Sequence, residues 1–526
     1  MTIVEVVFST YEKTTNERSD FMSAILCHTN ISEVVSKYPP KPVQNLTLTP
    51  GKFLVSLTWE DPADYTEEGY TCTWAKTVVV RKQGGYPNDI HDGTVVVTTV
   101  ERDKYKTSGY DDTGLTGGET YYYRVFTCST DGVYGSPAEG NCTPKSYKVM
   151  TVKINLANSN PATCGSFADD AVGMEFGKTA SAVAAWQEFF GYKPCLFKEG
   201  KVVGYLNPND FTKFENGRSA DITSGNAGDV MIEFPRHGVR ISKSGKVVTV
   251  SMTNDPNDPR FKYYAHQRGS VNKDYFYLGA YLGSLNTNTL GLYAVRSLSG
   301  TFCDNNQKIA YMYEYAQHNG DGYGVMCFYQ WLYIQVMYVL QYRGNLNSQV
   351  AHGYGLCDYG TAYKSGSCDK RGMMYGMRYS SSAPYPLKLF GLEDLWGNHD
   401  QFLNNVYIAP GSSGFHVFTT TDDTITDPSK YTDVGYYAET INNSNNYFTM
   451  CIGNSECGFI VDNSTSAGSS TTYFCDSAII VPRNDFPVAV VGGSDNSEQD
   501  FEGIFYFNLY FLRDYCDSPT VRLQYL

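Results

Sequence analysis

The chain has 526 residues, of which 42% are hydrophobic and only 18% charged, with 44 Tyr and 49 Gly. That length exceeds what a single hydrophobic core supports, so we expect about three or four folded units. The net charge of −14 would repel a polyanion, which excludes nucleic acid as an expected partner. Membrane insertion is also not expected, because the longest apolar stretch, residues 325–340, is short and interrupted by Gln330 and Gln335.

The cysteines do not follow a metal-binding pattern. The chain has 14 Cys but no C-x-x-C pair, and the closest spacings, Cys451/Cys457 and Cys357/Cys368, match no zinc template. The first 20 residues are acidic and lack the apolar core of a secretory signal. We therefore expect synthesis in a reducing cytosol, buried free thiols, no metal and no cofactor. A disulfide between Cys451 and Cys457 stays an alternative.

The first 145 residues divide at a proline cluster. Residues 1–38 are polar and too few to form a core, so we expect a segment that pairs with another chain. The prolines at 39, 40 and 42 predict a stiff linker. Beyond them, residues 39–145 contain short alternating runs between turn residues, which predicts a β-sandwich. The expected strands are 55–59, 77–82, 93–100 and 120–128.

Three motifs of this region give a resemblance. They are Leu57-Thr-Trp59, the strand at 78–82, and the run from Leu115 to Val125, in which Tyr121 follows Leu115 by six residues. Together they resemble a fibronectin type III domain, and Tyr121 is similar to the tyrosine of that family, whose hydroxyl bonds back to the backbone. The resemblance implies a spacer or adhesion module without chemistry of its own.

Residues 146–285 predict a β-rich intermediate region with one helix. The apolar positions alternate in most of its segments, while residues 181–190 have helical periodicity. We expect 229–234 and 239–242 to pair with each other, and a turn at Ser244-Gly245. The other expected strands are 150–156, 246–252 and 275–281.

Residues 286–526 predict two helices and long irregular loops. The helices are expected at 305–318 and 325–343, and the second is apolar on most faces, which indicates burial. Irregular loops on a rigid scaffold frequently carry function.

Two segments of this last region decide the functional interpretation. One is the run at 389–403, which contains Glu393-Asp-Leu-Trp396-Gly397-Asn398; the other runs from 490 to 525 and contains Gly492-Gly493, Gly503 and Arg522. They resemble the C-type-lectin fold, in the branch shared by retroelement-diversified phage receptor-binding proteins and the formylglycine-generating enzymes. The fold class expected is therefore multidomain and mainly β, with a fibronectin type III sandwich followed by an α+β lectin-like domain at 286–526.

The resemblance implies an exposed ligand-binding face between the last landmarks. Tyr and Phe side chains there would anchor a partner, while Asn, Ser and Gln adapt their hydrogen bonds. The expected contacts are Asp495, Asn496, Ser497, Gln499, Asp500, Phe501, Tyr506, Asn508 and Tyr510, with Arg513, Asp514 and Tyr515 as weaker additions. Phe505, Phe507 and Leu509 are expected to pack inward.

Other named residues are expected to be scaffold rather than ligand contacts. Trp in such a turn fills a core, Gly permits positive φ, and Asn can bond to the backbone. This set is Trp59, Tyr121, Glu393, Trp396, Gly397, Asn398, Gly492, Gly493, Gly503 and Arg522.

The sequence differs from the wider families at motifs that carry catalysis and metal binding. The Pro-containing calcium motifs of lectins are missing, and Asp255, Asp258 and Asp427, each followed by Pro, suggest turns. Cys475 and Cys516 match no active-site cysteine pattern. His399 beside Asp400 indicates a loop pair rather than a catalytic dyad. We therefore expect no enzyme activity.

The expected function is attachment of a bacteriophage to a bacterial surface receptor, glycan or protein. The chain would be a virion fibre or spike, anchored to other virion proteins by residues 1–38 and assembled as a homo-oligomer, a trimer in the resembling family. The alternatives are a structural decoration such as a head-fibre or collar protein, a surface-glycan-degrading or cysteine-oxidising enzyme, and a bacterial adhesin.

Overall fold

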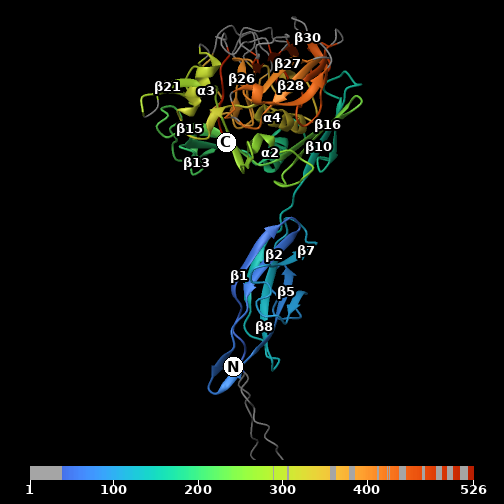
Figure 1. Ribbon diagram of the computed structural model, residues 1–526, viewed down its shortest axis with the longest axis vertical. Helices are drawn as coiled ribbons and strands as arrows, with labels where there is room; N and C mark the ends of the chain where they lie inside the picture. The colour runs from blue at the N-terminus through green and yellow to red at the C-terminus, as the bar shows by residue number, and fades with distance from the viewer. Residues whose placement is uncertain are drawn as a thin grey trace, which may run out of the picture. The chain divides into compact units, whose positions relative to one another are not determined.

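The computed structural model describes two compact, mainly β units, residues Met1–Ser146 and Tyr147–Leu526 (Figure 1). The residues described are 38–287, 290–304, 307–355, 363–377, 386–411, 414–422, 424–425, 427–437, 446–464, 468–480, 488–493, 502–509 and 519–526. The division after residue 146 lies one residue from the expected boundary at 145/146.

The first unit is a sandwich of two antiparallel sheets. One sheet has the order β1-β2-β7 and the other β6-β5-β8-β9, with a hairpin β3-β4 beside them. Val55, Leu57 and Trp59 from the first sheet pack with Val79 and Tyr123 from the second. The strands are β1 (Gln44–Gly51), β2 (Leu54–Glu60), β3 (Tyr65–Glu67), β4 (Tyr70–Cys72), β5 (Trp74–Gln83), β6 (Thr94–Thr99), β7 (Tyr110–Thr113), β8 (Tyr121–Ser129) and β9 (Ala138–Cys142).

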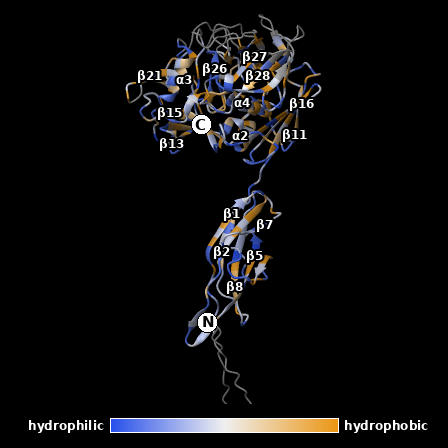
Figure 2. Cartoon of the chain, in the orientation of Figure 1, coloured by the Kyte–Doolittle hydropathy of each residue, from blue (hydrophilic) through white to orange (hydrophobic). Residues whose placement is uncertain are grey.

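Alternation of apolar and polar residues explains these strands. In β2 every second residue is fully buried, since successive side chains of a strand point to opposite faces. Figure 2 shows orange and blue residues interspersed along the strands of this unit. All four strands expected from the sequence coincide with β2, β5, β6 and β8.

Two buried side chains near strand ends of this sandwich, Trp59 and Tyr121, form hydrogen bonds with neighbouring residues. The indole N–H of Trp59, which is buried, donates to Asp61 Oδ1 at 3.1 Å. The buried Tyr121 hydroxyl accepts a hydrogen bond of 3.0 Å from the backbone N–H of Thr116. The tyrosine therefore fixes the turn that precedes β8.

Replacing Tyr121 by Phe tests that contact. The Tyr121→Phe variant leaves the Thr116 N–H without its acceptor, so the first unit should lose about 1–2 kcal/mol of unfolding free energy. Urea denaturation measures the loss. Tyr122→Phe on the same strand is the control, because Tyr122 is half-buried and its ring packs on Tyr86. Equal stabilities of the two variants would contradict the role assigned to Tyr121.

The described residues of the second unit form four sheets of three or more strands. Their orders are β11-β10-β17-β16, β14-β13-β12-β15-β20-β35-β23, β26-β33-β34-β32-β30-β31 and β27-β28-β29. The strands of the first two sheets are β10 (Val149–Asn155), β11 (Gly165–Asp169), β12 (Lys193–Lys198), β13 (Lys201–Asn207), β14 (Asp210–Phe214), β15 (Asp229–Pro235), β16 (Gly238–Ser244), β17 (Val247–Thr253), β20 (Tyr275–Gly279), β23 (Tyr323–Val325) and β35 (Leu523–Tyr525).

The strands of the remaining sheets come from residues 401–509. They are β26 (Gln401–Leu403), β27 (Val406–Gly411), β28 (Gly414–Thr419), β29 (Thr432–Tyr437), β30 (Asn446–Cys451), β31 (Val461–Ser464), β32 (Ser477–Ile480), β33 (Ala489–Val491) and β34 (Phe507–Leu509). Three two-stranded ribbons complete the unit: β18 (Gln267–Arg268) with β19 (Val271–Asn272), β21 (Ser284–Thr287) with β22 (Tyr293–Arg296), and β24 (Lys388–Leu389) with β25 (Leu392–Glu393).

Helix α4 (Phe328–Gln341) lies in the core of this unit. All 14 of its residues are buried, and it contacts β10, β17 and α2. Its first turn is capped by Gln330, whose side chain accepts from the N–H of Cys327 at 3.0 Å. The expected buried helix at 325–343 therefore coincides with α4. The other helices are α2 (Ala180–Phe190), α3 (Ile309–Gln317), α5 (Ser348–Ala351), η1 (Tyr264–His266) and η2 (Pro428–Lys430).

Two expectations about this part of the chain are wrong. Segments 229–234 and 239–242 do not pair, because β15 lies between β12 and β20 whereas β16 pairs with β17. The expected boundary at 285/286 also fails, because β20, β35 and β23 are neighbours in one sheet and one core spans both regions. The C-terminal strand β35 lies inside this sheet, between β20 and β23, although both of these strands are distant from it in the sequence.

Candidate functional site

The two sequence segments that resemble lectin-like proteins meet in the second unit. Trp396 is fully buried, and its indole N–H donates to the carbonyl of Gly353 at 3.0 Å. Gly397, at φ +89°, donates its N–H to the carbonyl of Gly492 at 3.0 Å. Asn398 donates to Asp394 Oδ2 at 2.9 Å. The turn is thus tied to the core and to the chain that follows β33.

Glycine is required where these segments touch. A Cβ on Gly492 would lie 2.5 Å from the carbonyl oxygen of Leu395, and one on Gly493 would overlap the carboxyl of Glu502. Gly503 is equally confined, by Ser348. The two ends of the connection from β33 to β34 are therefore closely packed.

Arg522 links the turn to the C-terminal strand. It is fully buried and donates from Nη1 to the carbonyls of Gly279 (2.9 Å) and Ala280 (3.2 Å). Its Nη2 donates to the carbonyls of Glu393 (2.7 Å) and Asp394 (3.3 Å). Nε donates to Oε1 of Gln401 at 2.9 Å. Burial lowers the pKa of Arg522 to about 10, opposed by the nearby carboxylates.

Other buried charges surround Arg522. The Glu393 carboxylate accepts from the backbone N–H groups of Gly366 (2.7 Å) and Cys368 (2.9 Å), and burial raises its pKa. Lys388 donates to the carbonyl of Cys368 at 2.6 Å, and burial lowers its pKa. A small pocket opens onto Glu393, Asp394 and Asn398. Because its donors hold Glu393 in place, this arrangement suits a scaffold better than proton transfer.

Most of the expected binding residues lie outside the described part of the chain. These are Asp495, Asn496, Ser497, Gln499, Asp500, Phe501, Tyr510, Arg513, Asp514 and Tyr515. The same is true of residues 1–37 of the expected anchor.

Tyr506 and Asn508 correct the expected binding face. Each is only 5% exposed, and Asn508 Nδ2 donates to the Tyr506 hydroxyl at 3.0 Å. Burial raises the pKa of Tyr506 far above its usual range. Phe507 and Leu509 are buried as well, because β34 is an interior strand covered on both faces. The expectation that alternate residues of this strand are exposed is therefore wrong.

The strand directions around β34 divide the remaining candidate binding residues into two groups, one before β34 and one after it. β34 is antiparallel to β33 and parallel to β32, with Val491 opposite Phe507. The chain leaves β33 and enters β34 at one edge of the sheet, and it leaves β34 after Leu509 at the opposite edge. The residues that flank segment 494–501 and those that flank residue 510 therefore belong to different edges.

Asp400 and Glu502 were not singled out from the sequence as a pair. Both are buried beside Gly493, and the Asp400 carboxylate accepts from the N–H of Gly493. Burial raises the pKa of Asp400 to about 7, and Asp400 Oδ1 lacks a hydrogen-bond partner among the described residues. The sequence offered only a His399-Asp400 dipeptide, which indicates a loop pair rather than a catalytic dyad.

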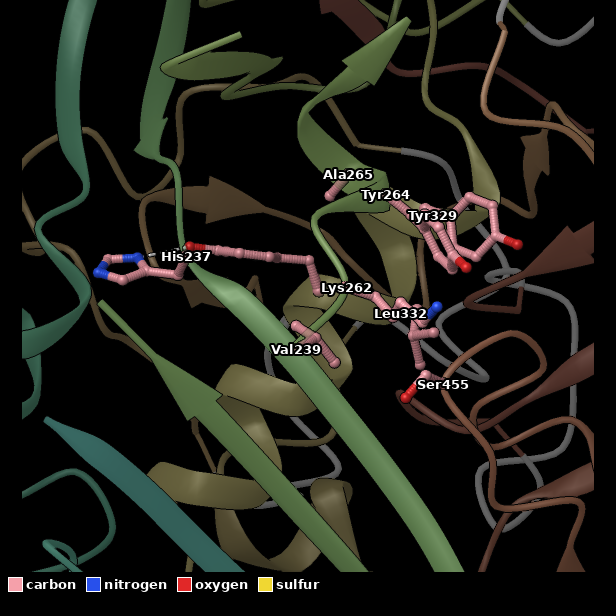
Figure 3. A pocket seen from close by; sticks show the side chains of 9 residues that line it. His237, Val239, Lys262, Tyr264, Ala265, Tyr329, Leu332 and Ser455 are labelled. Atoms are coloured by element: carbon pink, nitrogen blue, oxygen red, sulfur yellow. Dashed lines mark hydrogen bonds between the residues drawn. The ribbon is translucent and has the colours of Figure 1, made fainter. Parts of the chain in front are cut away.

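A second pocket lies between β16, η1 and α4 (Figure 3). His237 Nδ1 is 2.9 Å from the Tyr333 hydroxyl, and burial lowers the pKa of His237 to about 4. Ser455, at the other side in Figure 3, accepts from the N–H of Ile241 and donates to its carbonyl. This serine is therefore bonded to backbone and not to a histidine.

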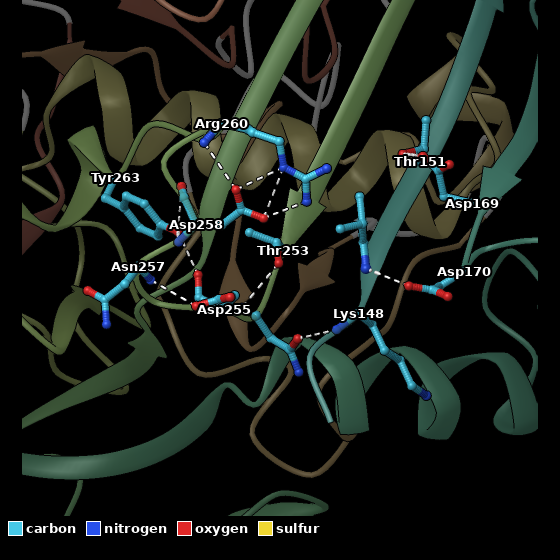
Figure 4. A network of polar contacts seen from close by, with 12 residues as sticks. Lys148, Thr151, Asp169, Asp170, Thr253, Asp255, Asn257, Asp258, Arg260 and Tyr263 are labelled. Carbon is cyan, nitrogen blue, oxygen red and sulfur yellow. Dashed lines mark hydrogen bonds and ion pairs between the residues drawn. The ribbon is translucent and has the colours of Figure 1, made fainter. Parts of the chain in front are cut away.

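The two Asp-Pro sites after β17 form turns, as expected (Figure 4). Asp255 accepts from the N–H of Asn257 at 3.1 Å, and Asp258 from that of Arg260 at 3.0 Å. Arg260 also forms an ion pair of 2.6 Å with Asp258, and Tyr263 donates to the carbonyl of Asp255. These carboxylates therefore stabilise a loop.

Comparison with known proteins gives no assignment. No protein-family model matches the chain, and a search of curated proteins found no match. Among the described residues, no cluster of three or more His, Cys, Asp or Glu is arranged to hold a metal ion. None of the helices in the described ranges is long and apolar enough to span a bilayer.

We call the place where Arg522 joins the turn at 393–398 to the C-terminal strand the junction. Replacing Arg522 tests this junction. Arg522→Met removes five hydrogen bonds and leaves buried acceptors unpaired, so the second unit should lose about 3–5 kcal/mol of unfolding free energy. Urea denaturation measures it, with the exposed Arg218→Met as control, expected within about 0.5 kcal/mol of the parent. An Arg522→Met protein as stable as the control would refute the role of this side chain.

The raised pKa of Asp400 predicts a pH dependence. The native carboxyl keeps its proton to about pH 7, whereas an unfolded Asp releases it near about pH 4. The folded state binds more protons in this window, so this group destabilises it progressively as the pH rises from about 4 to about 7. Asp400→Asn cannot ionise.

The stability of Asp400→Asn relative to the parent should therefore increase through that window and level off above it. Unfolding free energies of both proteins at pH 5, 6, 7 and 8, a series that spans the pKa of about 7, measure the trend. A difference that stays constant, or shrinks with rising pH, would show that Asp400 is ionised in the native state.

Proposed function

We propose that the chain is a bacteriophage virion fibre or spike protein that attaches to a bacterial surface receptor without catalysis. The observation that carries the proposal is the junction at Arg522, where the turn at Trp396–Asn398, the Gly492-Gly493 pair and the C-terminal strand come together. These are the segments whose motifs resemble lectin-like receptor-binding proteins, and they lie up to about 130 residues apart in the sequence.

Contacts within the first unit also support the proposed domain assignment. The sandwich of the first unit, its buried Trp59 and the Thr116–Tyr121 hydrogen bond support a fibronectin type III spacer. The second unit would be the C-type-lectin-like receptor-binding part. Residues 1–38 would anchor the chain to other virion proteins, and a homotrimer would multiply weak single-site affinity.

The proposed receptor contacts are the residues between β33 and β34. Asp495, Asn496, Ser497, Gln499, Asp500 and Phe501 stay in the proposal, as does Tyr510, which follows β34 in the sequence. Tyr506 and Asn508 leave it because they are buried. The confined glycines at 492, 493 and 503 give this connection a rigid base, which reduces the entropy lost when a partner binds.

Adsorption by the purified full-length protein tests the proposal. Labelled protein is mixed with the bacteria that the source phage infects, and the cell-bound fraction is measured. The triple variant Asn496→Ala, Gln499→Ala, Phe501→Ala should bind at least about tenfold more weakly, because truncated anchors at an interface cost more than about 1 kcal/mol each.

The control changes exposed residues elsewhere in the unit. Glu199→Ala with Lys201→Ala should leave adsorption unchanged, since both lie at the turn between β12 and β13. Equal adsorption by the triple variant and the control would contradict the proposed contacts. A parent protein that binds no cells but is needed to assemble the particle would favour a structural decoration.

A further inference from the structure

A cluster of exposed apolar side chains lies around the β21–β22 hairpin and α3. Of fifteen large hydrophobic residues that are exposed in the described chain, five fall between 290 and 311. They are Leu290, Leu292, Tyr293, Phe302 and Tyr311, exposed by 45–79%. Scattered exposed apolar residues are ordinary, but such a concentration indicates an interaction surface.

Helix α3 carries two stacked tyrosines, of which Tyr311 is exposed and Tyr315 is half-buried against the core. Ile309, Met312 and Ala316 are buried and pack against the sheet. Tyr311 and Tyr315, four residues apart and therefore on one helix face, have nearly parallel rings, with centroids 6.2 Å apart and an interplanar angle of 24°.

The β21–β22 hairpin lies beside α3 (Figure 1) and supplies a third tyrosine. The ring of Tyr293 lies 6.0 Å from that of Tyr315. The hairpin and helix are held together by Asn319, whose Nδ2 donates to the carbonyl of Val295 at 2.8 Å, and by His318, whose Nδ1 lies 2.7 Å from the Tyr293 carbonyl oxygen. We call Tyr293, Tyr311 and Tyr315 the tyrosine platform.

The chemistry of the platform favours a sugar ring as its partner. An aromatic face carries a negative quadrupole, so it attracts the weakly positive C–H face of a pyranose, and tyrosine hydroxyls can bond its hydroxyl groups. Exposed polar side chains, Glu314 and Gln317, lie among the rings on α3. A protein partner would instead gain most from a pocket that buries an anchor.

The charges on α3 indicate a neutral ligand. From Lys308 to His318 the segment carries one Lys and one Glu, so opposite charges balance. The Glu314 side chain is 63% exposed and lies 3.8 Å from His318. An anionic polysaccharide would find no excess of positive charge on this helix.

We infer that the tyrosine platform is a second binding surface of this chain, which stacks on a neutral glycan. Its residues belong to α3 and β22 and not to β33 or β34. The choice of a bacterial surface glycan rests on the proposed attachment function, whereas sugar binding by the platform does not.

Affinity electrophoresis of the full-length protein tests the inference. The gels contain a neutral glucan, the neutral capsular or O-chain polysaccharide of the host, or an acidic capsular polysaccharide. Retardation by at least one neutral polysaccharide is expected. Tyr311→Ala and Tyr315→Ala should each weaken that binding by about tenfold, the usual effect of removing an aromatic anchor.

Two controls distinguish a loss of folding from a loss of the binding surface. Alanine is the best helix former, so both variants should keep α3. Tyr311→Ala should also keep the parent's unfolding midpoint, whereas Tyr315→Ala loses packing against the core and should have a lower midpoint. Tyr275→Ala is the matched control, because Tyr275 is 46% exposed, against 47% for Tyr311, but lies on β20. It should bind like the parent.

Three results would overturn the inference: no retardation by any neutral polysaccharide, equal retardation of the parent and Tyr311→Ala, or self-association in sedimentation that Tyr311→Ala abolishes. The last would make the platform a contact between copies. Loss of cell adsorption in the variants of segment 494–501, with glycan binding intact, would leave both proposals standing. Glycan binding by a protein that adsorbs to no cells would refute the attachment function alone.

Discussion

The second unit depends on the burial of one guanidinium. A fully buried cation is costly unless its donors are satisfied, and Arg522 has five acceptors around it. Four of them are backbone carbonyls, at the end of β20 and in the turn after β25. These segments must therefore converge for the charge to be buried, which fixes β35 between β20 and β23.

The same junction determines where binding can occur. Since β34 lies inside a six-stranded sheet and is covered on both faces, its side chains serve packing. Variation is tolerated best in the connections between strands, where it does not disturb the core. A rigid base at Gly492 and Gly493 is consistent with the proposed attachment role. The tyrosine platform would add a separate contact of lower specificity.

Local sequence patterns predicted much of the fold. Alternation in residues 55–59 and 120–128 identified β2 and β8, because one face of each strand meets the opposite sheet. The mostly apolar run at 325–343 identified α4, which is buried all round. Trp396 and Arg522 were recognised as scaffold from their motifs, and the structure places both in the core.

The wrong sequence-based expectations share one physical cause, because strands pair with partners that are distant in the sequence. The pattern Tyr506-Phe-Asn508 looks half-exposed, but neighbours from β32 and β33 surround the strand, and Asn508 is satisfied by Tyr506. Adjacent segments 229–234 and 239–242 belong to different sheets, which no local period reveals. The buried Asp400 has no sequence signal, since its partner Gly493 is 93 residues away.

Hydrogen exchange provides the most direct test of the claim that the turn and the C-terminal strand form one rigid body. The N–H of Gly397 bonds to Gly492, and that of Met326 bonds to Arg522. If the account is right, these amides and those of β35 exchange together, at the rate of global unfolding of the unit. Exchange of β35 well before the amides of α4 would show that the junction opens on its own and contradict the account.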